Sequence, residues 1–458
     1  MTVVFILSVI CVFVYSGILL WHFSHKKEID GFFIVSFMYD VVYGILPALL
    51  SWEVLFDGSQ SNYVKRILDL SSEGILALLY YYLYALLCFI VVTLAYYGRI
   101  KQLQLDDRRP ISKKNKYPDS LLPTVAWICL AIGMCSLYLW SKAYGSIFIL
   151  MQKANSVRSG YGGVTNSFAF FKHPAKVVML CTMLFLTLIL KGNPTKKITV
   201  RSISDFVGFI LSSICSYLYL IANDGRLTIM IFLLALFWMF FAGKKIKHAS
   251  RAILVGCVVI ALGLLLLLQM DNITRYIRTG VWISENSGEK VTELIIRELG
   301  FLPQGGQTSI LSAWNGKVGL TAVDDLITGV FAWIPTKFKP SGFDDVWNTN
   351  TILIYGDLSV LHGQAPCSIV TQAYYDLRFA GIILFGILLG NFVRKVDDWK
   401  PSEDAMVKYA VKANIMEMLF RAVPYFSMFD IVLGFFPLLV VIVIYRAVAI
   451  VKHAIQRG

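Results

Sequence analysis

The chain has 458 residues, of which 57% are hydrophobic, and it carries a formal net charge of +13. Soluble globular proteins contain about 45 to 50% apolar residues, so this composition, with a mean hydropathy of +0.66, excludes a soluble globule. The charge does not indicate nucleic-acid binding, because the basic residues lie in short segments between apolar runs. The composition therefore predicts a polytopic α-helical membrane protein.

Apolar runs of about 20 residues, long enough to cross a bilayer, recur along the chain. We predict eleven spans, at residues 2–24, 31–50, 75–98, 120–141, 174–191, 203–222, 227–243, 252–270, 378–394, 404–420 and 429–447. The first run has no basic segment before it and no small-residue cleavage site after it, so we interpret it as a span and not as a cleaved signal peptide. The predicted fold is all-α, with eight spans in residues 1–270, a long helical outer loop over 271–377 and three spans in 378–458.

The distribution of Lys and Arg predicts the orientation, since positively charged short loops tend to remain in the cytoplasm. Segment 99–116, "RIKQLQLDDRRPISKKNK", is strongly basic and is placed inside. Alternation from this segment places every other strongly basic short loop on the same side, with the N-terminus outside and the C-terminus inside. The predicted outer segments are 51–74, 141–172, "NDGR" at 223–226, and 271–377.

The long outer segment is not a linker, because it contains Trp282, Trp314, Trp333 and Trp347 among recurrent apolar positions. We expect short helices that lie over the membrane mouth. The piece "IFILMQKA" within 141–172 is too short to cross the membrane and is expected to form an interfacial or re-entrant helix.

The cysteines give little support to catalysis. Seven of them lie within apolar runs, where they are most simply small hydrophobic residues. Cys367 lies near an aqueous boundary, but a single thiol without a matching His and Asn pattern is a weak candidate nucleophile. The sequence contains no CxxC, HExxH or GxxxxGK motif, so no metal or nucleotide cofactor is expected.

Two arginines at predicted outer turns are candidate ligands of an anion. Arg226 begins a span, where free amide groups and the helix dipole add positive charge. Arg421 lies where one span ends and the chain turns before the next. Arginine binds phosphate oxygens in pairs and loses water more readily than lysine. The alternatives are that Arg226 pairs with Asp224 or reaches lipid headgroups, and that Arg421 is an interface anchor.

Other outer residues are weaker candidates. Arg275 and Arg278 are three residues apart and share one helix face, for which a headgroup-facing stripe is the favoured alternative. Lys339 lies in the turn-rich basic piece "WIPTKFKPSGFDD", for which loop packing is the favoured alternative. These positions therefore support a ligand only in combination with others.

Two outer histidines are candidate bases. His173 and His362 are the outer histidines, and the imidazole of His362, in "VLHGQAPCSIVTQAYYDLRFAG", could take a proton from a hydroxyl group. A structural histidine is the favoured alternative. Asp224, Glu298 and Asp376 are competing carboxylates, and the sequence does not rank them.

The pieces "YGSIFILMQKANSVRSGY", "DGRLTIMIFLLALF", "WIPTKFKPSGFDD", "HGQAPCSIVTQAYYDLRFAGIILFGILLG" and "LFRAVPYFSM" follow one another over residues 140–430. Together with the long outer loop before the last three spans, they resemble the O-antigen polymerase (Wzy-type) family of Gram-negative bacteria. This family is similar in fold to membrane-embedded GT-C glycosyltransferases and to O-antigen ligases.

The resemblance implies an inner-membrane glycosyltransferase that polymerises undecaprenyl-pyrophosphate-linked O-antigen repeat units at the periplasmic face. It implies no nucleotide sugar and no metal, and a separate protein that regulates chain length. Diphosphate is a good leaving group, and cationic groups must stabilise its growing charge. We therefore expect direct displacement with inversion and no covalent enzyme intermediate.

Some residues of this sequence match the family's pattern, and one departs from it. Arg226 and Arg421 match the family's arginines at a span start and in the last outer loop, and Arg158 falls in "NSVRSGY". Arg378 stands where a glycine is common, which puts a role for Arg378 in doubt. The candidate catalytic residues are therefore His362, Arg226 and Arg421, and the candidate substrate-binding residues are Arg158, Arg278, Lys339, Tyr374 and Asp224.

Two other functions stay open at this point. An O-antigen ligase would transfer the chain to lipid A core instead of to another repeat unit. A flippase or transporter of lipid-linked oligosaccharide would use the same ligand, but transporters usually contain internal repeats with broken helices in matching positions. The two halves of this sequence are unlike each other, which favours an enzyme.

Overall fold

A computed structural model describes residues 1–58, 61–98, 119–154, 157, 167–191, 200–223, 225–242, 276, 280, 291–334, 338, 342–356, 364–399 and 406–456. Over these residues the chain forms helices and turns and no β-strand. The predicted all-α class of membrane protein is confirmed to this extent.

In chain order the helices are α1 (Thr2–Lys26), α2 (Gly31–Tyr39), the π-helical η1 (Asp40–Ile45), α3 (Leu46–Trp52), the π-helical η2 (Glu53–Asp57), α4 (Ser61–Ile67), α5 (Ser72–Tyr97), the 3₁₀ turn η3 (Asp119–Leu121), α7 (Leu122–Ala143), α8 (Ile147–Gln152), the 3₁₀ turn η4 (Ser167–Phe171), α10 (Lys172–Ala175), α11 (Val177–Lys191), α12 (Val200–Asn223), α13 (Arg226–Phe241), α15 (Val291–Leu299), α16 (Phe301–Trp314), α17 (Ala322–Val330), α18 (Val346–Tyr355), α19 (Ile369–Asp398), α20 (Met406–Ala422) and α21 (Met428–Ile455).

Eight helical segments of the described chain are long and apolar enough to cross a membrane. They are Thr2–Lys26, Gly31–Phe56, Ser72–Tyr97, Asp119–Ala143, Phe168–Lys191, Val200–Asn223, Ile369–Asp398 and Met428–Ile455. The predicted spans 227–243 and 404–420 correspond to α13 and α20, which have 16 and 17 residues and are short for a full crossing. The predicted span 252–270 lies outside the described residues. The count of eleven spans is therefore not confirmed.

Polar side chains fix where several of the long helices begin. Asp30, Ser71, Ser368 and Ser427 precede α2, α5, α19 and α21, and each accepts a hydrogen bond from a backbone N–H in the first turn. Such N-caps satisfy amide groups that the helix itself leaves without partners. The helix starts are therefore specified locally, even inside an apolar sequence.

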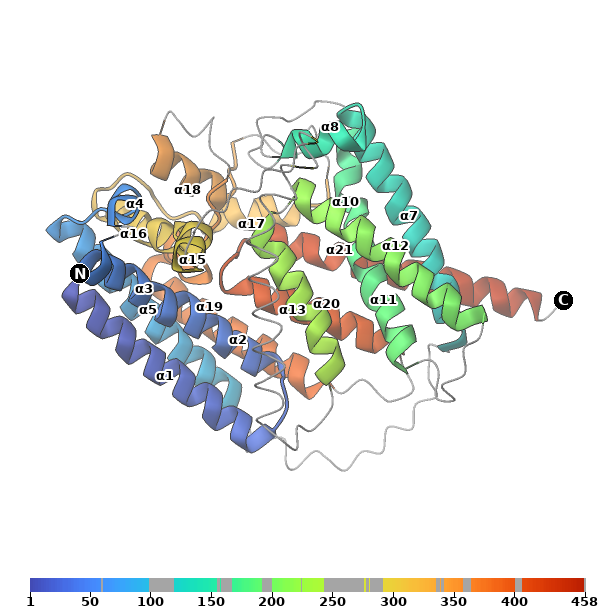
Figure 1. Ribbon diagram of the computed structural model, residues 1–458, viewed down its shortest axis with the longest axis horizontal. Helices are drawn as coiled ribbons and strands as arrows, with labels where there is room; N and C mark the ends of the chain where they lie inside the picture. The colour runs from blue at the N-terminus through green and yellow to red at the C-terminus, as the bar shows by residue number, and fades with distance from the viewer. Residues whose placement is uncertain are drawn as a thin grey trace.

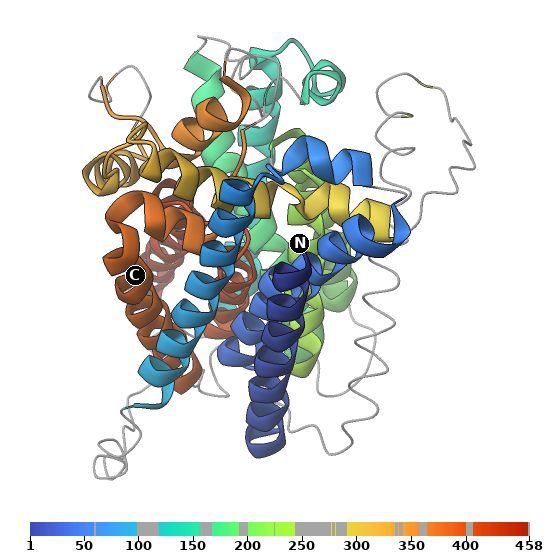
Figure 2. The ribbon, with the colours of Figure 1, turned by 90° about the vertical axis from the view of Figure 1, so that its left-hand side faces the viewer.

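Four short helices, α15 to α18, come from the predicted outer loop, and we call them the cap helices. Figure 2 shows α15 to α17, in yellow and gold, lying across the ends of the upright helices, where α16 packs on α5 and α17 packs on α21, while Figure 1 shows α15 to α18 gathered on one side of the molecule. The predicted short helices over one end of the spans are present. The described piece of "IFILMQKA" likewise forms the short helix α8.

Helix α19 packs against the cap helices α16 and α17. Its straight part packs along α5, and Gly386 and Gly390 allow the close approach: a Cβ atom on Gly390 would lie 2.4 Å from the carbonyl oxygen of Val92. Small residues at membrane-helix contacts commonly serve this purpose. At its start, α19 is tied to the turn between α20 and α21, because the N–H of Ile369 donates to the carbonyl of Val423 at 3.1 Å.

Candidate functional site

Two clusters of buried polar groups lie near the two ends of the straight part of α19. One surrounds Asp397 in its last turn, and the other surrounds Asp376 just before a kink at Leu377 and Arg378. A helix rises 1.5 Å per residue, so about 30 Å separate these two carboxylates along α19. In one cluster the buried side-chain oxygens accept hydrogen bonds from nearby donors, and in the other several do not. This difference identifies the candidate site.

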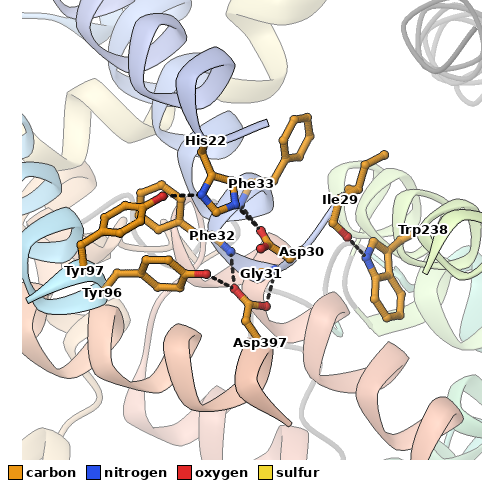
Figure 3. A network of polar contacts seen from close by, with 10 residues as sticks. All are labelled: His22, Ile29, Asp30, Gly31, Phe32, Phe33, Tyr96, Tyr97, Trp238 and Asp397. Carbon is orange, nitrogen blue, oxygen red and sulfur yellow. Dashed lines mark hydrogen bonds and ion pairs between the residues drawn. The ribbon is translucent and has the colours of Figure 1, made fainter. Parts of the chain in front are cut away.

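The first cluster, which we call the clamp cluster, ties the start of α2 to α1, α5 and α19 (Figure 3). Asp397 accepts from the N–H of Gly31 at 2.7 Å and of Phe32 at 3.1 Å, and from the hydroxyl of Tyr96 at 3.1 Å. His22 is fully buried and lies 2.8 Å from Asp30 through Nε2.

The remaining contacts close the clamp cluster. The Nδ1 atom of His22 contacts the hydroxyl of Tyr97, and Asp30 also accepts from the N–H of Phe33 at 3.0 Å. The indole N–H of Trp238 on α13 donates to the carbonyl of Ile29 at 2.6 Å. Each of these polar atoms has a partner within the chain, so the clamp cluster is a structural joint and offers no free group to a ligand.

The second cluster, which we call the acceptor cluster, consists of Asp325 on α17 and Gln372 and Asp376 on α19. Thr321 donates to one oxygen of Asp376 at 2.9 Å, and Gln372 donates to the other at 3.2 Å. Asp325 is 1% exposed and Gln372 is fully buried. Neither the two carboxylate oxygens of Asp325 nor the side-chain oxygen of Gln372 has a hydrogen-bond donor in the described part of the chain.

Burial dominates the electrostatics of Asp325. It raises the pKa of this carboxyl from 3.8 to about 8, with further increases from the charges of Asp376 and Asp345. The backbone N–H of Met428, at the start of α21, acts in the opposite direction and favours the charged form, although it does not complete a hydrogen bond. A carboxyl group that titrates near neutral pH, close to charged neighbours, is a candidate for acid–base chemistry.

Arg421 lies beside the same end of α21. Its guanidinium is 3.5 Å from Asp430 in the first turn of α21 and 3.6 Å from Glu417 one turn back on α20. Arg421 is 9% exposed and Glu417 is 3% exposed. An arginine that anchors a helix at the interface reaches out to lipid headgroups. Arg421 instead forms buried ion pairs, which hold its guanidinium in one place.

The first turn of α21 therefore joins a guanidinium on one side to a buried carboxyl on the other. Asp430 in this turn pairs with Arg421, and the N–H of Met428 in the same turn faces Asp325. The amide groups of a helix N-terminus add partial positive charge at this point. Such an arrangement could hold an anion and a hydroxyl-bearing group close to each other.

Most of the other predicted site residues lie outside the described residues. These are Arg158, Asp224, Arg278, Lys339 and His362, and of Arg226 only the backbone is described, as the first residue of α13. The helices that carry Arg226 and Arg421 pack against each other, with the rings of Trp238 and Tyr409 stacked at 6.2 Å. The convergence of the two arginines remains a prediction.

Tyr374 and Arg378 occupy structural positions at the kink of α19. The ring of Tyr374 stacks on that of Tyr84 at 5.6 Å, and the guanidinium of Arg378 lies 5.4 Å from the centre of the Tyr374 ring. Arg378 donates to the carbonyls of Val318 at 2.6 Å and Gly319 at 2.9 Å. These contacts hold both side chains in place, and the substrate-binding role of Tyr374 stays a prediction.

The described part of the chain also includes three further candidates from the sequence. Glu298 pairs with the adjacent Arg297 at 3.4 Å on α15. The ring of His173 lies 6.5 Å from that of Phe429, in the first turn of α21. Cys367 is fully buried, and burial raises the pKa of its thiol well above 9, so it is unsuited to act as a nucleophile.

Sequence reasoning missed Asp325, Gln372 and Glu417. Asp325 lies in "TAVDDLITGV", where the apolar residues Val323 and Leu326 are exposed and the acid points inward. An amphipathic pattern normally places the apolar face toward the core, so the pattern alone gives the opposite orientation.

The chain was compared with known proteins by sequence and by structure. No protein-family model, no curated protein and no solved structure matches it. The resemblance to O-antigen polymerases therefore stays a hypothesis from the quoted sequence segments.

Proposed function

We propose that the chain is an inner-membrane glycosyltransferase that polymerises undecaprenyl-pyrophosphate-linked oligosaccharide repeat units at the periplasmic face. The observation that carries the proposal is the first turn of α21, which has a buried guanidinium on one side and a buried carboxyl on the other. The reaction needs positive charge for the departing diphosphate and an acceptor of the hydroxyl proton.

In the proposed mechanism, Arg421 binds the diphosphate oxygens, and the partial positive charge at the N-terminus of α21 adds to its field. Charge grows on these oxygens as the anomeric bond breaks, and fixed donors stabilise it without reorganisation. Glu417 and Asp430 offset the charge of Arg421, so further cations are needed. Arg226, Arg158, Arg278 and Lys339 are the proposed sources, and a chain-length regulator is the proposed protein partner.

The first prediction concerns Arg421. Each variant is expressed in a strain from which the chromosomal gene for this protein has been deleted. Arg421→Ala should abolish long O-chains, because the diphosphate loses its fixed cation, and the ladder of lipopolysaccharide bands on a gel measures this directly. The double variant Glu417→Gln/Arg421→Ala should also lack long O-chains. It does not leave the buried carboxylate of Glu417 without its cationic partner. Arg446→Ala, an exposed arginine on the same α21, is the matched control and should leave the ladder unchanged.

The same gel separates the alternatives. Loss of a polymerase leaves core with one repeat unit, whereas loss of a ligase leaves bare core. Immunoblots of the membrane fraction check that each variant is inserted. Unchanged ladders from both Arg421 variants would overturn the proposed role of the guanidinium, and bare core in the deletion strain would assign the chain to the ligases.

A further inference from the structure

The acceptor cluster contains more hydrogen-bond acceptors than donors. Asp325 and Gln372 are at least 99% buried, yet three of their oxygens lack a donor in the described part of the chain. Buried polar groups in native proteins nearly always have partners. The clamp cluster shows that this chain can provide them, since the oxygens of Asp397 together receive three hydrogen bonds.

Unsatisfied acceptors are complementary to a ligand that brings donors. Sugar hydroxyls are such donors, and carboxylate and amide oxygens are their usual partners in a buried site. A phosphate group brings acceptors and negative charge, so it would be repelled by Asp325, Asp376 and Asp345. The acceptor cluster therefore fits the carbohydrate part of a substrate and not its diphosphate.

We propose that Asp325, Gln372 and Asp376 form the subsite for the acceptor sugar, and that Asp325 is the general base that takes the proton of the attacking hydroxyl. The subsite rests on the proposed function. The sequence did not single out Asp325, and the role of His362 stays a prediction because it lies outside the described residues.

The step balances without a further reagent. The hydroxyl oxygen of the acceptor sugar forms a bond to the anomeric carbon of the donor, and its proton passes to a carboxylate oxygen of Asp325. The bond from the anomeric carbon to the diphosphate oxygen breaks, and its electron pair leaves with the undecaprenyl diphosphate. The products are the extended glycoside, the lipid diphosphate and protonated Asp325, which then loses its proton to water.

The neighbours of Asp325 suit a base that works near neutral pH. Asp376 on α19 and Asp345 at the start of α18 disfavour its charged form, and the N–H of Met428 on α21 favours it. Thr321 and Gln372 hold Asp376 in place. Because the pKa of Asp325 is about 8, the ionised fraction reaches about one half near that pH and approaches one above it, and the rate of polymerisation should rise with it.

The second prediction is a pH–rate profile, measured with the full chain in proteoliposomes and undecaprenyl-diphosphate-linked repeat units as substrate. The wild-type rate should increase with pH, be half-maximal near pH 8 and level off about one pH unit above that value. Asp325→Asn should lower kcat by about 10² to 10⁴-fold, leave the KM for the acceptor within about threefold and remove the pH dependence. Asp324→Asn, the neighbouring and more exposed acid on α17, is the matched control and should keep the wild-type profile.

The outcomes distinguish the two proposals. A wild-type protein that does not extend lipid-linked repeat units overturns the proposed polymerase and, with it, the subsite. A wild-type protein that does extend them while Asp325→Asn keeps its rate and pH profile overturns only the role of Asp325. A rise in the KM alone, with kcat unchanged, overturns the base and leaves a binding residue.

Discussion

At the scale of single residues, the two buried carboxylates at either end of straight α19 have opposite surroundings. Asp397 accepts three hydrogen bonds from Gly31, Phe32 and Tyr96. Asp325, near the other end, accepts none among the described residues. A residue that a fold leaves unsatisfied usually reduces stability in exchange for function. Asp325 should therefore be a site at which removing charge makes the protein more stable.

The third prediction tests this difference through stability. The pKa of Asp325 is about 8 in the folded chain and near 3.8 when exposed, so between these values the folded state binds more protons than the unfolded state. The free energy of unfolding then falls as pH rises through this window. The Asp325→Asn variant does not lose stability in this way as the pH rises. Its Tm should therefore exceed that of wild type by little at pH 4 and by most above pH 8. Thermal unfolding in detergent at both pH values measures it, and an equal Tm difference at the two would contradict it.

Residue roles were the least predictable part of the chain. The sequence indicated that Arg421 lies at a turn between helices, which is confirmed, but its partners Glu417 and Asp430 depend on how α20 and α21 meet. Tyr374 is a candidate substrate-binding residue by sequence, and the structure adds that it is 7% exposed and packed on Tyr84. Long-range packing decides such roles, and a single sequence does not record it.

At the scale of helices, α19 contains an unusual break. Leu377 and Arg378 leave the helical conformation, and Arg378 has φ 54° and ψ −137°, a backbone conformation that favours glycine. The arginine side chain compensates by donating to the carbonyls of Tyr374, Val318 and Gly319. These hydrogen bonds explain why an arginine can occupy a position whose backbone conformation favours glycine.

The fourth prediction compares two substitutions at this break. Arg378→Gly loses the hydrogen bonds but relieves a backbone strain of about 1 to 3 kcal/mol, whereas Arg378→Ala loses the hydrogen bonds and keeps the strain. The glycine variant should therefore be the more stable of the two in a thermal unfolding assay. If both variants unfold at the same temperature, the positive φ carries no strain.

Helix α17 also shows how an element can be predicted while its orientation is not. Its exposed apolar residues Val323, Leu326 and Val330 form a stripe on one face, and Asp325 faces inward. In water this arrangement would be unfavourable, but a helix at a membrane interface buries its apolar face in lipid. The spacing of apolar residues predicts that this segment is a helix. Which face of the helix points toward the core depends on whether water or lipid surrounds it.

At the scale of the whole molecule, the apolar runs predicted the long spans well. Eight described segments have the length and composition of membrane spans. The predicted spans over α13 and α20 are apolar in sequence but form helices of only 16 and 17 residues. Hydropathy records local composition, while the length of a helix also depends on where neighbouring segments end it.

The fifth prediction concerns orientation. The basic segments predict that the Lys26 end of α1 faces the cytoplasm and that the cap helices face the periplasm. A cysteine at Lys317, exposed between α16 and α17, should react with a membrane-impermeant maleimide in intact cells. A cysteine at Lys27, exposed after α1, should react only after the inner membrane is opened. The reverse pattern would place the acceptor cluster on the cytoplasmic side and exclude a periplasmic reaction.

The clamp cluster has a consequence for how the protein is made. Gly31 and Asp397, which it joins, are separated by 366 residues (Figure 3). At a synthesis rate of about 5 to 20 residues per second, the start of α2 is complete for roughly 20 to 70 s before its carboxylate partner leaves the ribosome. During that interval the N–H groups of Gly31 and Phe32 lack the acceptor that Asp397 provides in the folded chain. Nascent chains that stop before α19 should therefore be the forms most open to membrane chaperones and quality-control proteases.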